Sequence, residues 1–205
     1  MSDKWLRWAQ EIQALAQSGL AFSKDMYDRE RYERLRLLSA EIMAEYTHTP
    51  MEKIEELFMG ETGYPTPKVD VRAVIFQEDK ILLVKEKMDN RWSLPGGFCD
   101  IGLSPAENIV KEVQEEAGYL TVATRLLAVL DMQKHPHPPQ AYHYYKLFFA
   151  CDIISGEARE GLETKDVAFF KKDELPSLSI ARNTDSQLRM LFAFLDEPTK
   201  GTIYD

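Results

Sequence analysis

The chain has 205 residues, which is enough for one ordinary domain and a small second one. Its hydrophobic content of 44% and charged content of 29% are typical of a soluble globular protein. The formal charge of −9, from 25 basic and 34 acidic residues, argues against non-specific binding to nucleic acid or to an anionic membrane.

The first 60 residues contain three amphipathic segments. Residues 3–18 have an apolar helical stripe, and Gly19 is expected to end that helix. A second helix is predicted from Asp28 as its N-cap, and a short third one from Thr49 to about Phe58. The apolar face expected on the second helix consists of Tyr32, Leu35, Leu38, Ile42 and Tyr46. We expect residues 1–63 to form a helical domain with its linker, and 64–205 to form the second domain.

After the Gly- and Pro-rich linker, the hydrophobic period changes to that of strands. Residues 69–76 and 81–84 are predicted to form a hairpin around the turn 77–80. The later elements are expected at 126–132, 142–154 and 167–170 as strands, and at 184–195 as a helix, with a turn at Ser155-Gly156. Strands with one helix between them and one after them predict an α+β fold with a mixed sheet between helices.

The run from Gly96 to Tyr119 is a glycine loop followed by a helix. Ser104 is the predicted N-cap, with Pro105 at the first helical position and Glu107 completing a capping box. Gly118 is expected to end the helix. The predicted buried stripe consists of Ala106, Ile109, Val110, Val113 and Ala117.

Three carboxylates, on Glu112, Glu115 and Glu116, lie beside this stripe at i, i+3 and i+4. Like charges at these spacings repel by about 0.2–0.5 kcal/mol per pair, and the helix dipole disfavours anions in the last turns. A solvated acidic face is one interpretation. The other is a site for Mg²⁺ or Mn²⁺, which prefer carboxylate oxygens and accept water and phosphate as further ligands.

The same run resembles the signature of the Nudix hydrolases. With Gly97 as the first glycine, six positions match in register: Glu112, Val113, Glu115, Glu116, Gly118 and Tyr119. Two positions depart from the signature, with Leu103 in place of a glutamate and Lys111 in place of an arginine. The resemblance implies an α/β/α sandwich and metal ligation by Glu112 and Glu116, with Glu115 as a third or water-mediated ligand. Leu103 cannot bind a metal as the signature's glutamate does, so another carboxylate would have to supply that ligand, such as Asp100 or Glu163.

The N-terminal segment also resembles the small domain that precedes one Nudix subgroup, described as ADP-ribose pyrophosphatase-like and including CDP-choline pyrophosphatases. The stretches that carry this resemblance are 5–9, 15–21 and 27–32. It narrows the substrate class without fixing it. Packing of the thin helical core on a second subunit is expected, which predicts a homodimer.

Further side chains are candidates for the chemistry. Gly96 and Gly97 allow the backbone to approach phosphate closely. The general base is predicted to be either Glu163, just before the last strand, or Glu115. Arg72, inside a β-rich run, is expected either to pair with a carboxylate or to bind phosphate bidentately. Three of the four histidines, at 135, 137 and 143, are interpreted as structural or surface residues.

Two functional interpretations follow. The first is a metal-dependent pyrophosphohydrolase that cleaves a nucleoside diphosphate linked to a small group, with CDP-choline favoured and ADP-ribose second. A choline group would require an aromatic cage, for which Tyr142, Tyr144 and Tyr145 are candidates. The second is a catalytically silent Nudix module that binds a nucleotide as a sensor or docking domain. Leu103 and Lys111 favour the second slightly, whereas the intact glutamate triple favours the first.

The two cysteines form no disulfide framework and no signal or transmembrane segment is expected, so we predict a cytoplasmic protein.

Overall fold

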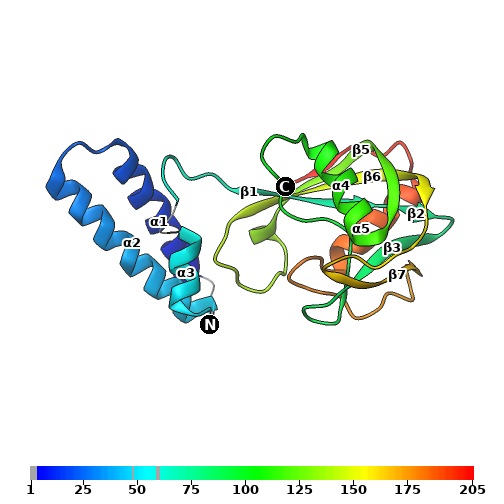
Figure 1. The fold of residues 1–205 in the computed structure, drawn as a ribbon, viewed down its shortest axis with the longest axis horizontal. Coiled ribbons are helices and arrows are strands. Elements are labelled where there is room, and N and C mark those ends of the chain that lie inside the picture. Colours follow the sequence, from blue (N-terminus) through cyan, green and yellow to red (C-terminus); the bar gives the residue numbers. More distant parts are fainter. Residues whose placement is uncertain (1–3, 48, 59–60) are drawn as a thin grey trace. The chain divides into compact units, whose positions relative to one another are not determined.

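Figure 1 shows the fold as given by a computed structural model. The residues that it describes are 4–47, 49–58 and 61–205. The chain divides into two compact units, of which the first extends to Pro67 and also includes 139–143. The second unit contains 68–138 and 144–205. None of the helices in the described part is long and apolar enough to cross a membrane.

The first unit contains helices α1 (Lys4–Phe22), α2 (Met26–Thr47) and α3 (Met51–Phe58). Its buried apolar side chains are Leu6, Ala9, Ala40, Met43, Ile54 and Ala141. Ala141 comes from the segment 139–143, whose backbone carbonyls at Gln140 and Ala141 accept hydrogen bonds from the Gln10 amide at 2.9 and 3.0 Å. The segment 139–143, which lies in the chain between two strands of the second unit, is therefore part of the helical core.

Two predicted helix ends are wrong in this unit. Helix α1 continues past Gly19 to Phe22. Glycine at this position does not end the helix but makes room for the Tyr32 ring, with which a Cβ would collide. The N-cap of α2 is Asp25 and not Asp28, since the Asp25 carboxylate accepts the backbone N–H groups of Tyr27 and Asp28 at 2.9 and 3.0 Å.

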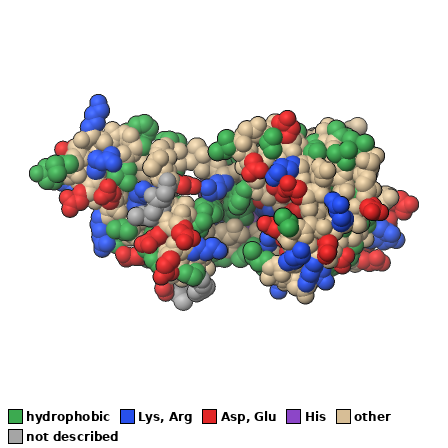
Figure 2. Space-filling model, viewed as in Figure 1, with side chains coloured by type: hydrophobic (Ala, Val, Ile, Leu, Met, Phe, Trp, Pro, Cys, Tyr) green, Lys and Arg blue, Asp and Glu red, His purple; other side chains and the backbone are tan. Residues whose placement is uncertain are grey.

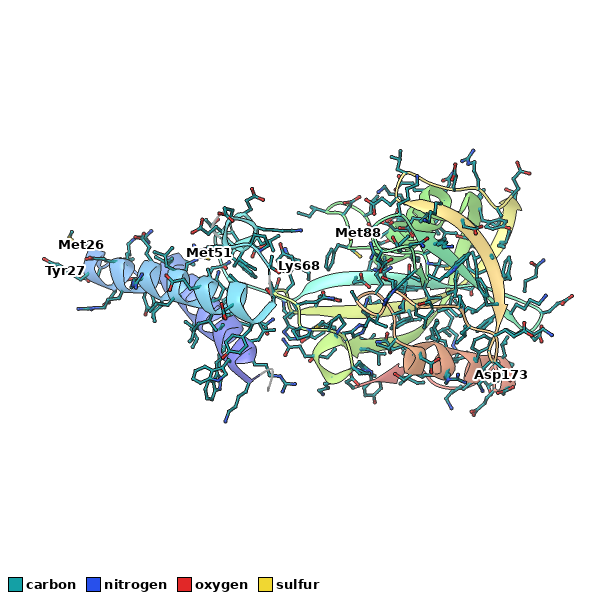
Figure 3. The ribbon with its side chains drawn as sticks, turned by 90° about the horizontal axis from the view of Figure 1, so that it is seen from below. Met26, Tyr27, Met51, Lys68, Met88 and Asp173 are labelled. Atoms are coloured by element: carbon teal, nitrogen blue, oxygen red, sulfur yellow. The ribbon has the colours of Figure 1, made fainter. Side chains whose placement is uncertain are left out.

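The buried face of α2 also differs from the predicted one. Arg36, Ser39, Ala40 and Met43 are buried. Leu35, Leu38 and Tyr46, which were expected to be buried, are 40%, 36% and 38% exposed. Two of these four, Ser39 and Ala40, are small, whereas Leu35, Leu38 and Tyr46 lie on the more exposed side of the helix. Figure 3 shows Met26 and Tyr27, both exposed, at the start of α2, next to the turn that joins it to α1.

The second unit contains two sheets in its described residues. The first has the order β1 (Lys68–Val74), β6 (Tyr144–Gly156), β5 (Tyr119–Asp131) and β8 (Ile203–Tyr204). Its β1–β6 and β5–β8 pairs are parallel and its β5–β6 pair is antiparallel. The second sheet is antiparallel and contains β2 (Phe76–Gln77), β3 (Lys80–Glu86), β4 (Trp92–Ser93) and β7 (Thr164–Lys171). The α+β class with a mixed sheet is confirmed.

Two helices cover these sheets. Helix α4 (Pro105–Ala117) packs on a core cluster that includes Val71 and Leu82, and α5 (Asp185–Asp196) packs on a second cluster that includes Leu83 and Phe148. A short 3₁₀ turn, Met132–Lys134, follows β5. On the face of this unit seen in Figure 2, acidic and basic side chains are interspersed.

The predicted hairpin is confirmed only at its tip. Phe76 and Gln77 pair with Ile81 and Lys80, but the residues up to Val74 belong to the first sheet. The chain crosses between sheets at Ile75, which is 1% exposed and packs in the core beneath α4. The predicted turn at Ser155-Gly156 is wrong, because β6 continues through Gly156, which pairs with Tyr119.

Candidate active site

Helix α4 begins and ends as its sequence predicts. The Ser104 hydroxyl accepts the Glu107 backbone N–H at 3.2 Å, and the Glu107 carboxylate accepts the Ser104 N–H at 2.8 Å. Gly118 closes the helix with a left-handed φ of 79°. Ile109, Val113 and Ala117 are buried as expected. Ala106 is exposed, because it lies in the first turn, beyond the reach of the core.

The glycine loop runs along strand β1. Backbone hydrogen bonds join Ala73 N–H to the Pro95 carbonyl and Val71 N–H to the Gly97 carbonyl, both at 2.8 Å. Gly96 has a φ of 139°, and a Cβ at this position would collide with the Val71 carbonyl. Glycine is therefore required here, and the backbone that it approaches closely is strand β1.

Glu112 and Glu116 both face this loop. The Gly96 N–H donates to Glu116 Oε2 at 2.8 Å, and a Cβ added to Gly97 would lie 3.2 Å from Glu112 Oε1. Burial raises the pKa of Glu116 to about 8, against the lowering effect of the nearby Arg72 charge. Burial also raises the pKa of Glu112.

Glu115 has a different environment. Its carboxylate is exposed and lies 3.2 Å from the Lys111 ammonium, which also donates to Asp100 at 3.0 Å. These two hydrogen bonds raise the pKa of Lys111 to about 12. Within the described residues, no three Asp, Glu, His or Cys side chains converge as a metal cluster. The structure thus brings Glu112 and Glu116 together and gives Glu115 a lysine partner.

The loop between Asp100 and Ser104 is held by Asn108, a residue that the sequence-based predictions do not include. Its side-chain oxygen accepts the Asp100 N–H at 2.8 Å, and its amide nitrogen donates to the Leu103 and Ser104 carbonyls at 3.2 and 3.1 Å. Asn108 is 1% exposed. A polar residue on the otherwise apolar face of α4 was the available signal. Leu103 itself is 40% exposed.

Glu163 lies in the loop before β7. This loop is attached to α4, since the Thr164 hydroxyl accepts the Gly161 N–H at 2.8 Å and donates to the Glu116 carbonyl at 2.6 Å. The Lys87 N–H donates to the Glu163 carbonyl at 2.8 Å. The Glu163 side chain is exposed and has no partner in the part of the chain that the structure describes.

Arg72 pairs with a carboxylate, which is the first of its two predicted alternatives. Its guanidinium donates to both oxygens of Asp70, at 2.9 and 2.7 Å, and to the Leu94 carbonyl at 3.2 Å. The Lys146 ammonium donates to the same Asp70 at 3.0 Å, and all three side chains are at most 5% exposed. Asp70 and Arg72 alternate along β1, so they share a face of the strand.

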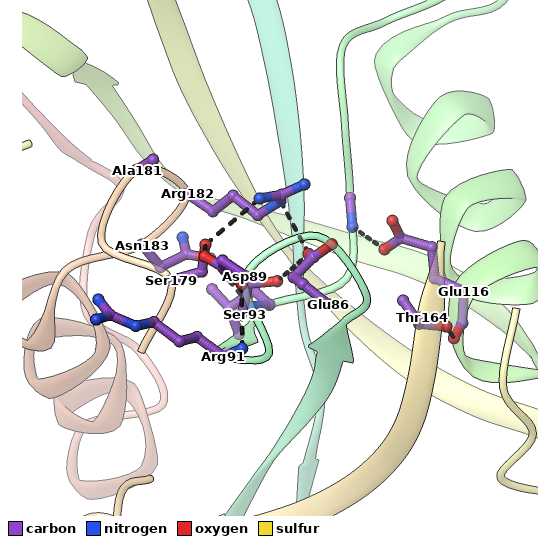
Figure 4. Close-up of polar contacts among 12 residues, drawn as sticks. Glu86, Asp89, Arg91, Ser93, Glu116, Thr164, Ser179, Ala181, Arg182 and Asn183 are labelled. Carbon is purple, nitrogen blue, oxygen red and sulfur yellow. Dashed lines mark hydrogen bonds and ion pairs between the residues drawn. The ribbon is translucent and has the colours of Figure 1, made fainter. Parts of the chain in front are cut away.

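A second polar cluster flanks the start of the glycine loop (Figure 4). Glu86 Oε1 accepts the Ser93 hydroxyl at 2.6 Å and forms an ion pair with Arg182 Nε at 2.9 Å. Leu94 N–H donates to Asn183 Oδ1 at 3.0 Å. After burial and the Glu112 charge, the charge of Glu86 also contributes to the raised pKa of Glu116.

The donor set on α4 fits a hard divalent cation. In the described part of the chain, Glu112 has no hydrogen-bond or ion-pair partner, and Glu116 Oε1 has none either. The buried polar atoms without partners there are Arg36 Nε, Thr121 Oγ1 and Asn183 Nδ2, so these carboxylate oxygens are open to solvent. Two carboxylates with water and phosphate as remaining ligands match the preference of Mg²⁺.

Comparison with known proteins places this fold and site in a class. A family model described as "NUDIX domain" matches residues 66–193. Another, described as "UDP-X-like, N-terminal oligomerisation domain", matches residues 3–58. The α+β fold, with its glycine loop leading into a carboxylate-bearing helix, is therefore the fold of a nucleotide hydrolase. The chain belongs to the Nudix family, and its N-terminal residues 3–58 match the UDP-X-like N-terminal domains.

Individual relatives agree with this assignment. A Bacillus subtilis (strain 168) protein named "Putative ADP-ribose pyrophosphatase YjhB" is 63% identical over 202 residues, covering 98% of this chain and 97% of that protein. The crystal structure of a UDP-X diphosphatase is 37% identical with a TM-score of 0.65, covering 99% of this chain and 98% of that one. An ADP-ribose pyrophosphatase from Streptococcus suis 89-1591 is 44% identical with a TM-score of 0.63, covering 68% and 100%. The chain is an enzyme that hydrolyses nucleoside diphosphate derivatives, which sets aside the silent-module interpretation.

Proposed function

We propose that the protein is a Mg²⁺- or Mn²⁺-dependent pyrophosphohydrolase. It cleaves the diphosphate of a nucleoside diphosphate linked to a small group, releasing a nucleoside monophosphate and a phosphorylated remainder. The observation that carries this proposal is the pair of carboxylates on Glu112 and Glu116 beside the backbone of Gly96 and Gly97. Of their four oxygens, only Glu116 Oε2 has a partner among the described residues, the Gly96 N–H. A bound cation would shield the phosphate charge and lower the pKa of a water nucleophile.

The protein's own groups have separate tasks. The Gly96 N–H fixes the orientation of the Glu116 carboxylate, and Lys111 fixes loop residue Asp100 to helix α4. Of the two candidate general bases, Glu163 is favoured because its carboxylate is uncommitted among the described residues, whereas Glu115 is paired with Lys111. The attachment of its loop to the last turn of α4, through Thr164, supports the same choice.

Two substrates are candidates, and they differ in the nucleoside and in the group linked to the diphosphate. The names of two relatives support ADP-ribose, and the resemblance of the N-terminal segment favours CDP-choline. Tyr144 is a poor member of the aromatic cage proposed for choline, since the Lys146 ammonium already lies 5.1 Å from the centre of its ring. Tyr145, on the same strand, is 40% exposed. We further propose a homodimer formed through the N-terminal helices, in a cytoplasmic setting.

The test is a turnover screen with the purified full-length chain over CDP-choline, ADP-ribose, NADH and dinucleoside polyphosphates. Each substrate is assayed with Mg²⁺, with Mn²⁺ and with EDTA, and the products are identified by mass. Cation-dependent release of a nucleoside monophosphate from one of the first two supports the proposal. Equal turnover in EDTA, or hydrolysis restricted to dinucleoside polyphosphates, would contradict it.

A further inference from the structure

The loop from Ser177 to Asn183, here called the 177–183 loop, is held against the strand that leads into the glycine loop. Trp92 N–H donates to the Ser177 carbonyl at 3.0 Å, and Ser179 N–H donates to the Trp92 carbonyl at 2.8 Å. His137 Nδ1 lies 2.8 Å from the Ile180 carbonyl, so it donates there in the tautomer that this contact requires. The backbone of this loop is therefore held in place, and so is the attachment point of each side chain that projects from it.

Arg182 is the cation that this loop carries. Its Nε forms an ion pair with Glu86 Oε1 at 2.9 Å, and Nη1 donates to the Ser179 hydroxyl at 3.4 Å (Figure 4). Glu86 is fixed in turn by the Ser93 hydroxyl at 2.6 Å, and its side chain is only 2% exposed. The guanidinium is thus anchored along one edge by a buried carboxylate.

The other edge of the guanidinium is available. Among the described residues Arg182 Nη2 has no partner, and it is absent from the buried atoms that lack one, so solvent reaches it. The two neighbouring cations differ in this respect. Arg72 and Lys146 are 5% and 1% exposed and both hold Asp70, whereas the Arg182 side chain is 22% exposed.

Arg182 also lies close to the reacting region. Its partner Glu86 accepts the hydroxyl of Ser93, and Asn183, which follows Arg182 in the chain, accepts the Leu94 N–H, so both are attached to the strand that leads into the glycine loop. The charge of Glu86 is also one of those that act on Glu116. We propose that Arg182 binds a non-bridging oxygen of the substrate diphosphate through its free Nη2 edge. A guanidinium anchored on one edge presents its remaining N–H groups in a fixed plane, which suits phosphate oxygens better than a mobile ammonium does. This inference rests on the proposed pyrophosphohydrolase function.

The experiment compares Arg182→Gln and Arg182→Lys with Arg189→Gln as the matched control. Arg189 is an exposed arginine on α5, paired with Asp185 at 2.6 Å, and it is outside the cluster. For each protein, KM and kcat are measured with the substrate identified in the screen and Mg²⁺. The inhibition constant of inorganic pyrophosphate and the melting temperature are measured in parallel.

We expect Arg182→Gln to raise both KM and the pyrophosphate inhibition constant by about tenfold or more, as for the removal of a hydrogen bond to a charged group. We expect kcat to change much less, Arg182→Lys to recover part of the affinity, and the control to match the wild type. Unchanged inhibition by pyrophosphate in folded Arg182→Gln would overturn the inference, as would a loss confined to kcat or to the melting temperature.

The failure of the proposed function is separable from the failure of this inference. A wild type without cation-dependent turnover contradicts the function, while calorimetric titration with pyrophosphate still measures whether Arg182 contributes to binding. If Arg182→Gln does not fold, Arg182→Lys and Ser179→Ala provide the comparison. Arg182→Lys keeps the charge but loses the planar fork, so wild-type affinity for pyrophosphate in that variant would contradict the role of Nη2.

Discussion

At the level of single side chains, the three glutamates at the end of α4 have unequal surroundings. Glu116 receives a backbone hydrogen bond, Glu112 has none in the described structure, and Glu115 is bound to a lysine. The helical period places all three on one flank, but it does not determine where each side chain turns. Lys111, four residues before Glu115, provides the competing partner.

This difference leads to a prediction on turnover. We expect Glu112→Gln and Glu116→Gln each to lower kcat by about 10²–10³-fold, because each removes a charge that holds the cation. Glu115→Gln should lower it by less than about tenfold if Glu115 acts only through Lys111. Steady-state kinetics with circular dichroism as a folding control make the measurement. A larger loss in Glu115→Gln than in Glu112→Gln would return Glu115 to the role of metal ligand.

The raised pKa of Glu116 predicts a pH dependence of stability in EDTA. Its native pKa is about 8, above the ordinary value of 4.5, so between these values the native state binds a proton that the unfolded state releases. That contribution is present at low pH and is lost as the pH rises to about 8. The melting temperature of Glu116→Gln should therefore increase relative to wild type between pH 5 and pH 8.

Thermal melts across this range test the effect, with Glu115→Gln as the control, since that carboxylate is exposed and paired with Lys111. The melting temperatures of the wild type and of Glu116→Gln should diverge as the pH rises, and their difference should stay constant above about pH 8. A difference that stays constant from pH 5 to pH 9 would show that burial does not perturb Glu116. Adding Mg²⁺ at pH 8 should raise the wild-type melting temperature and leave Glu116→Gln nearly unchanged.

At the level of elements, the loop from Asp100 to Ser104 is positioned by the helix that follows it. Asn108 makes hydrogen bonds to the Asp100, Leu103 and Ser104 backbones, and Lys111 reaches Asp100 from the next turn. Lys111 thus attaches the loop to the helix, with a point charge where the signature's arginine would present a planar fork. The departure at Leu103 leaves an exposed side chain on a loop that Asn108 holds.

We predict that Asn108→Ala destabilises the protein by about 1–3 kcal/mol, because it leaves backbone groups of the loop without partners. The catalytic efficiency should fall as well, since Asp100 and Leu103 lose their fixed positions. Urea unfolding and kcat/KM are the measurements. Gln114→Ala, an exposed position on the same helix, is the control and should be neutral. Wild-type stability in Asn108→Ala would mean that the loop is held by Lys111 alone.

The elements that the sequence predicted best are those with local signals. The capping box at Ser104 places the start of α4 at its observed position, and the helix expected from 184 begins at Asp185. The errors have non-local causes. The crossing of the chain at Ile75 depends on the pairing of β1 with β6, about 75 residues away, and Gly19 depends on Tyr32. The pairings of Asp70 with Lys146 and of Glu86 with Arg182 likewise cannot be predicted from sequence spacing.

For the whole molecule, the net charge of −9 opposes an anionic substrate. Positive charge near the site offsets this repulsion locally. Arg72 and Lys146 are held by one carboxylate, Asp70, so the Asp70–Arg72–Lys146 group carries a net positive charge. The charge of Arg182 also acts on Lys146. The proposed cation at Glu112 and Glu116 would add further positive charge, so the substrate's phosphates would meet a favourable field within a negative protein.

The exposed apolar face of α2 leads to the prediction for the assembled protein. Leu35 and Leu38 are solvent-exposed on a helix whose opposite face is already packed, and residues 3–58 match a domain described as an oligomerisation domain. Burial of such leucines removes apolar area from water, at roughly 25 cal/mol per Å². A second copy of the same helix is the partner that a homodimer supplies, and two-fold symmetry would place each leucine in the interface twice.

We therefore expect the double variant Leu35→Glu/Leu38→Glu to weaken self-association by at least tenfold in dissociation constant, about 1.4 kcal/mol. Sedimentation velocity over a concentration series measures it. Leu162→Glu, on a residue 96% exposed in the second unit, is the matched control and should associate like the wild type. Because the two leucines do not contribute to the α1–α2 core, the variant should keep its helical content. A variant that remains a dimer with wild-type affinity would place the interface on another face, and the exposed Trp5, Trp8 and Phe22 of α1 would be the next to substitute.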